Sequence, residues 1–125
     1  MRLILATLMI GLAGCDYLPD DRICSTPAPF DPTELTGPNA KPVVAIAEEC
    51  IHRWGYRLAG STESVTTVAE AVVRFCDQQI STQIVRLAEV NRDFKRSESW
   101  VMERSRSLAA AYVVQARAGN CGVPK

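Results

Sequence analysis

The chain has 125 residues, with 14 basic and 14 acidic side chains, a formal net charge of zero and five cysteines. This length accommodates one compact domain, and the zero net charge gives no electrostatic argument for binding nucleic acid, which requires a basic stripe. Hydrophobic residues make up 47% of the chain, which is too many for a wholly disordered protein.

The N-terminus has the pattern of an export signal. Arg2 supplies one positive charge, and the run from Leu3 to Leu12 is apolar except at Thr7 and Gly11. This run is too short to span a bilayer as a helix, which needs about 20 residues. It fits the apolar region of a secretory signal peptide.

The apolar run ends in Leu12-Ala13-Gly14-Cys15, which resembles the lipobox of bacterial lipoproteins. The resemblance implies that residues 1–14 are a signal peptide removed after Gly14. It also implies that Cys15 carries a diacylglycerol on its sulfur and becomes the N-terminus. The alternative is a buried apolar segment that happens to end in a cysteine.

Lipidation of this kind would hold the protein on a membrane, facing the periplasm or the outside of the cell. The resemblance implies at least two acyl chains, and two chains anchor a protein stably. Asp16, directly after the modified cysteine, resembles the signal for inner-membrane retention in enteric bacteria and slightly favours that membrane.

Residues 15–41 are predicted to form an extended, proline-rich tether. Six of the seven prolines lie between Pro19 and Pro42, and proline fixes φ and removes an N–H donor. A flexible segment of this length has a mean span of about 30 Å. Its acidic residues outnumber its basic ones, which disfavours adhesion to anionic headgroups and leaves the anchoring to the lipid.

Residues 42–121 are predicted to form an all-α domain, followed by a tail at residues 122–125. No glycine or proline occurs between Ser61 and Ala118. The predicted first helix covers residues 42–59 and ends before Gly60. Its apolar residues recur at steps of three or four, as expected for one helix face; they are Val43, Ala47, Cys50, Trp54 and Leu58.

The second predicted helix begins near Ser64, and the polar stretch 91–98 predicts a turn that Asp93 or Ser97 would cap. The third predicted helix runs from about residue 97 to 118. Its inward positions are Val101, Ser105, Leu108, Tyr112 and Ala116. These elements predict a small three-helix bundle, a helical hairpin plus a third helix. The alternative is one helix running straight through residues 64–118.

Once Cys15 is assigned to a lipid, an even number of cysteines remains. They are Cys24, Cys50, Cys76 and Cys121. In an exported domain they predict two disulfides, with three possible pairings. Antiparallel helices joined at residues 60–63 place Cys50 within bridging reach of Cys76, which leaves Cys24 to pair with Cys121. The alternative is four buried free thiols.

No catalytic residue, metal site or cofactor is predicted, apart from the covalent lipid on Cys15. The four cysteines are widely spaced and lack a C-x-x-C pair, so they do not have the spacing of a zinc site. His52 is the lone histidine, and it lies one position away from the Cys50/Trp54 face. It is interpreted as a half-exposed surface side chain rather than a catalytic base.

The candidate partner surface is formed by Arg53, Trp54, Tyr56 and Arg57. Arginine, tryptophan and tyrosine are enriched at binding hot spots. The alternative is that Trp54 fills the core while Arg53 and Arg57 form a solvated pair of like charges. A second basic cluster is either a solvated face or a contact for acidic partners or headgroups; it consists of Arg92, Lys95, Arg96, Arg104 and Arg106.

Together these features predict a membrane-anchored, exported lipoprotein with a non-catalytic binding or scaffolding role in the cell envelope. It is expected to bind an envelope protein, and neither nucleic acid nor a small-molecule substrate. Two alternatives stay open. One is a pilot or assembly lipoprotein of a secretion machine, and the other is a phage-encoded envelope lipoprotein that acts in lysis or exclusion.

Overall fold

A computed structural model of the protein describes residues 30–119, which form one short 3-10 helix and four α-helices without a strand. The elements are η1 (Pro32–Leu35), α2 (Val43–Leu58), α3 (Val65–Phe75), α4 (Asp77–Asn91) and α5 (Phe94–Arg117). The all-α prediction is confirmed for this part of the chain. The predicted signal peptide, Cys15, Cys24 and Cys121 lie outside the described residues.

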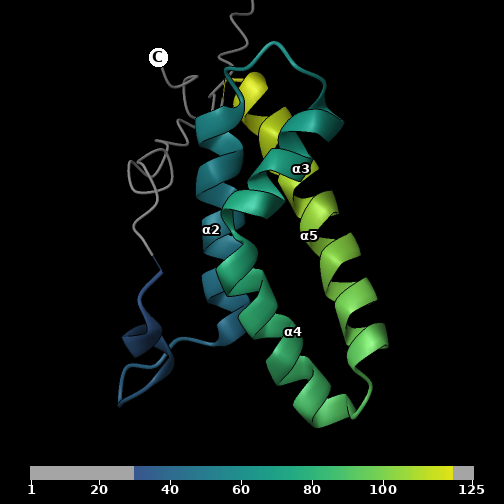
Figure 1. Ribbon diagram of the computed structural model, residues 1–125. Helices are drawn as coiled ribbons and strands as arrows, with labels where there is room; N and C mark the ends of the chain where they lie inside the picture. The colour runs from purple at the N-terminus through teal and green to yellow at the C-terminus, as the bar shows by residue number, and fades with distance from the viewer. Residues whose placement is uncertain (1–29, 120–125) are drawn as a thin grey trace, which may run out of the picture.

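The four α-helices pack side by side, with α3 and α4 running antiparallel to both α2 and α5 (Figure 1). Helix α5 contacts each of the other three. Two side-chain contacts show that α2 and α5 run parallel. Arg104 forms an ion pair with Glu48 at 2.7 Å, and the Tyr56 hydroxyl donates a hydrogen bond to Gln115 at 3.1 Å. None of the helices in residues 30–119 is at once long and apolar enough to cross a membrane.

The single second helix expected from the sequence is two helices, so the body has four α-helices where three were predicted. α3 ends at Phe75, α4 begins at Asp77, and Cys76 between them has φ −100° and ψ 14°. The junction contains neither glycine nor proline, the residues that mark a break in a sequence. The apolar stripe continues across it, because Val72, Cys76 and Ile80 are all buried.

The alternative of one helix through residues 64–118 is wrong, because the chain reverses direction after α4. Arg92 adopts the left-handed conformation, with φ 55°. Asp93 then caps α5, since its carboxylate accepts a hydrogen bond from the Arg96 backbone N–H at 3.0 Å. α5 therefore begins three residues before the predicted start.

The sequence predicted an extended tether, but the described end of the tether is not extended throughout. Residues 32–35 form η1, with Pro32 at its start, where a missing N–H costs no helical hydrogen bond. The Asp31 carboxylate accepts from the Thr33 backbone N–H at 2.9 Å. Lys41 then contacts Glu34 at 3.1 Å and Glu49 of α2 at 3.6 Å, which holds this segment against the start of α2.

The core lies between the helices, and the predicted stripes match it only in part. In α2, Ala47 and Cys50 are buried as predicted, whereas Trp54 and Leu58 are half-buried. α5 contributes a row of mostly small buried side chains, and small side chains let helix backbones approach closely. They are Ser97, Val101, Ser105, Ala109, Val113 and Ala116. Leu108 and Tyr112, also predicted to point inward, are half-buried at the edge of this row.

Gly55 lies where α2 packs closely against α5. A Cβ atom at this position would lie 2.9 Å from Cβ of Tyr112, which is closer than carbon atoms normally pack. Glycine inside a helix is less favourable than alanine by about 1 kcal/mol. The contact with Tyr112 therefore explains why a glycine is compatible with this buried position and a larger residue is not.

Replacing Gly55 with alanine should lower the free energy of unfolding by about 1 kcal/mol or more, because overpacking outweighs the gain in helix propensity. Urea unfolding measures the change. Ser107→Ala, on the exposed face of α5, is the control and should shift stability by less than about 0.5 kcal/mol. A stabilised Gly55→Ala protein would contradict the close packing of α2 on α5.

Candidate functional site

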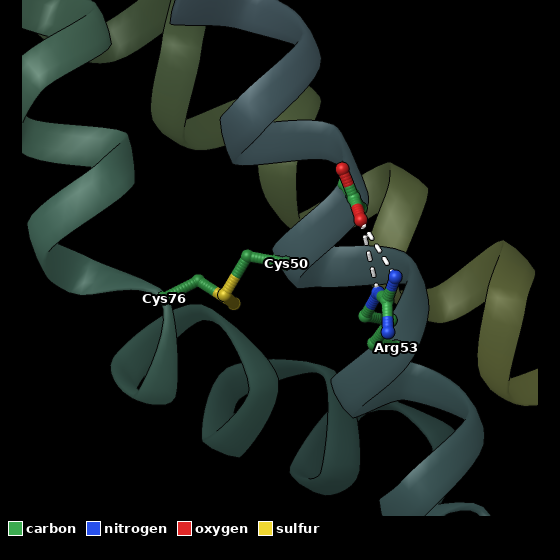
Figure 2. Close-up of a disulfide and its surroundings, with 4 residues drawn as sticks. Cys50, Arg53 and Cys76 are labelled. Carbon is green, nitrogen blue, oxygen red and sulfur yellow. Dashed lines mark hydrogen bonds and ion pairs between the residues drawn. A yellow bond between two sulfur atoms is a disulfide. The ribbon is translucent and has the colours of Figure 1, made fainter. Parts of the chain in front are cut away.

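A disulfide joins Cys50, in the middle of α2, to Cys76 at the α3–α4 junction (Figure 2). The two Cα atoms are 5.9 Å apart, and both side chains are buried. The predicted pairing of Cys50 with Cys76 is therefore confirmed. The bridge therefore ties α2 to the junction between α3 and α4.

Replacing both Cys50 and Cys76 with alanine should lower the free energy of unfolding by about 3.6 kcal/mol, because the open chain gains conformational entropy. Denaturant unfolding measures this loss, and a peptide map under non-reducing conditions identifies the bridge in the natural protein. Free Cys50 and Cys76 thiols in protein taken from its native compartment would contradict the assignment.

The predicted partner surface does not gather into one patch. Arg53 pairs with Glu49 one turn earlier on α2, at 2.7 Å (Figure 2). Trp54 is half-buried, and its ring stacks on Phe75 of α3 with centroids 4.1 Å apart. Tyr56 is buried toward α5, whereas Arg57 is exposed.

His52 is half-buried between α2 and α5, where its ring stacks on Tyr112 with centroids 3.8 Å apart. Tyr56 approaches the same ring edge-on at 4.6 Å. The Nε2 atom of His52 is buried and has no hydrogen-bond partner among the described residues. Burial lowers the pKa of His52, and the charge of Arg53 lowers it further.

Because His52 binds a proton less readily in the folded state, stability should fall as the pH is lowered. The unfolded histidine has a pKa near 6.5, so the stabilisation is complete above that pH and is lost as the pH falls through the lower pKa of the folded state. Urea unfolding at several pH values measures the slope. His52→Phe preserves a stacked ring and should flatten this slope, since the chain has no other histidine; an unchanged slope would contradict the assignment.

Three of the exposed large apolar side chains lie around the α4–α5 turn, here called the hairpin end and defined as residues 87–100; Phe75 and Val114, which are about equally exposed, lie elsewhere. Val90 is 79% exposed, Phe94 53% and Trp100 51%. Isolated exposed apolar residues are common on protein surfaces, but a group at one end of a molecule indicates a binding surface. The sequence analysis did not select these three residues, because their helical positions alone do not show that no neighbour covers them.

A groove of about 830 Å³ runs between the end of α4 and the start of α5. Leu87 and Trp100 supply apolar parts of its lining, and Asn91, Arg96 and Glu103 supply polar ones. It combines an aromatic ring with hydrogen-bonding and charged groups, so it has the composition of a binding groove.

The second predicted basic cluster is divided by the structure. Arg104 pairs with Glu48 of α2 at 2.7 Å and lies 5.6 Å from the Trp100 ring centroid. Arg106 pairs with Glu70 of α3, also at 2.7 Å. The other three members, Arg92, Lys95 and Arg96, are exposed at the hairpin end.

Arg92 is the one non-glycine residue of positive φ in residues 30–119. The left-handed conformation costs a residue with a Cβ atom about 1 kcal/mol, and glycine adopts it without that cost. An arginine at this turn keeps a cation at the apex of the hairpin at some expense in stability. Such a conflict between local preference and residue identity is common at functional positions.

The described residues contain no group of three or more His, Cys, Asp or Glu side chains that could hold a metal ion. No protein-family model matches the chain, and no curated protein or solved structure matches it either. The functional argument therefore depends on the chain's own residues.

Proposed function

We propose that the protein is an exported, lipid-anchored lipoprotein with a non-catalytic binding or scaffolding role in the cell envelope. The Cys50–Cys76 disulfide is the observation that carries the proposal. Disulfides persist in exported proteins, whereas the cytosol keeps most thiols reduced. The lipobox resemblance at Cys15 supports the same compartment from an independent part of the sequence.

The binding role is supported by the hairpin end. The groove between the end of α4 and the start of α5 offers a surface that the body itself does not cover. The groove also favours one alternative, the pilot or assembly lipoprotein of a secretion machine. A groove between two helices is a suitable place for a partner helix to pack.

A second disulfide between Cys24 and Cys121 remains part of the proposal. It would tie the tether to the tail that follows α5 and leave no free thiol once Cys15 is acylated. The non-reducing peptide map that identifies the Cys50–Cys76 bridge tests this pairing as well. Free thiols at Cys24 and Cys121 would contradict the second bridge without affecting the first.

Replacing Cys15 with serine should release the protein from the membrane fraction, because the acyl chains supply the anchoring free energy, about 0.8 kcal/mol per buried methylene. Cell fractionation and the intact mass of the purified protein measure the change. Cys24→Ser is the control and should remain acylated and membrane-bound. A natural chain whose mass includes no acyl groups would contradict the proposal.

A further inference from the structure

The hairpin end extends beyond the rest of the helical body. Hydrogen-bonded pairs between α2 and α5 are separated by 56 to 59 residues in the sequence, which places the start of α2 level with about Trp100. The six residues of α5 before Trp100 therefore project past α2 by about 9 Å. In Figure 1, the end of α4 and the turn that follows it reach below the first turn of α2.

The projecting part combines apolar and basic side chains. Val90, Phe94 and Trp100 are at least half exposed. The basic residues of the hairpin end are Arg92, Lys95 and Arg96, and its acidic residues are Glu89, Asp93 and Glu98, so three positive and three negative charges leave no net charge. Aromatic rings and long basic side chains are typical of the layer between lipid headgroups and acyl chains, where basic groups extend to the headgroups.

The tether joins the body at this same end. Residues 30–42 lead into the start of α2, and Lys41 holds them there through Glu34 and Glu49. Fourteen residues separate Cys15 from Phe30. A flexible segment of that length has a mean span of about 20 Å, so an anchor at Cys15 would keep this end close to the bilayer.

We propose that the hairpin end docks on the membrane that holds the lipid anchor, with Val90, Phe94 and Trp100 entering the interfacial layer. This inference rests on the proposed function, because the anchor supplies the local concentration that makes a small apolar contact sufficient. The body then has a fixed orientation, with the α2–α3 loop and the end of α5 away from the hairpin contact.

Site-specific photocrosslinking tests the contact in living cells. A photoreactive amino acid replaces Phe94 in one full-length chain and Val114 in another; both side chains are 53% exposed and lie at opposite ends of α5. The expected result is a phospholipid adduct at position 94, several times more abundant than at position 114. An adduct with a protein partner or with a second copy, or equal lipid labelling at both positions, would overturn the inference.

Tryptophan fluorescence provides a second readout. Trp54→Phe leaves Trp100 as the single tryptophan, since the chain has two. In the acylated protein reconstituted into phosphatidylethanolamine–phosphatidylglycerol vesicles, brominated acyl chains should quench Trp100. Phe94→Glu should reduce the quenching several-fold, and Val114→Glu should leave it unchanged. If Trp100 is quenched equally with and without Phe94→Glu, docking through the hairpin end is contradicted.

The mass of the natural chain separates this inference from the proposed function. Acyl groups on Cys15 together with unquenched Trp100 and no lipid adduct at position 94 would retain the anchor and overturn the docking. A natural chain without acyl groups would contradict the proposed function itself. In either case, the lipid adduct at position 94 tests the membrane contact independently of the acyl groups on Cys15.

Discussion

The packing of α5 against all three other α-helices is the interaction on which the structure depends. α5 achieves this with a buried row of mostly small side chains, ending in Ala109, Val113 and Ala116. Small residues reduce the distance between helix axes and leave little space for adjustment, because protein interiors are close-packed. Gly55 makes the same contribution from α2, opposite Tyr112. The α2–α5 contact therefore tolerates shape changes poorly on both sides.

Two further constraints hold the remaining helices to this pair. The Cys50–Cys76 bridge fixes the α3–α4 junction to α2. At the other end, the Arg117 guanidinium donates to the backbone carbonyls of Ala59, Ser61 and Glu63, at 2.7–3.1 Å. Neither constraint involves a residue of the hairpin end. That part of the body is therefore free to present its side chains to a membrane or a partner.

Periodicity in the sequence was sufficient to predict the helices, the extent of α2 and the Cys50–Cys76 pairing, because all three follow from helix geometry. It predicted the buried faces only in part, since Trp54, Leu58 and Tyr112 are half-buried whereas Ala109 and Val113 are buried. It could not predict the break at Cys76, because no glycine or proline interrupts the pattern there. Tertiary packing determines the direction that α4 takes after α3. The exposure of Val90, Phe94 and Trp100 was equally inaccessible. It depends on where α2 begins relative to α5, which is a property of the assembled bundle.

The position of the bridge has a consequence for the order in which the fold forms. Cys50 and Cys76 both precede α5 in the chain, so their bridge does not require the helix that completes the core. In an exported chain, a covalent ring around α2 and α3 can close in the oxidising compartment before α5 has packed. Arg117, two residues before the end of the described chain, acts on the α2–α3 loop only afterward. The Cys50–Cys76 bridge can thus form before the core. α5 then packs against helices that the bridge already holds together.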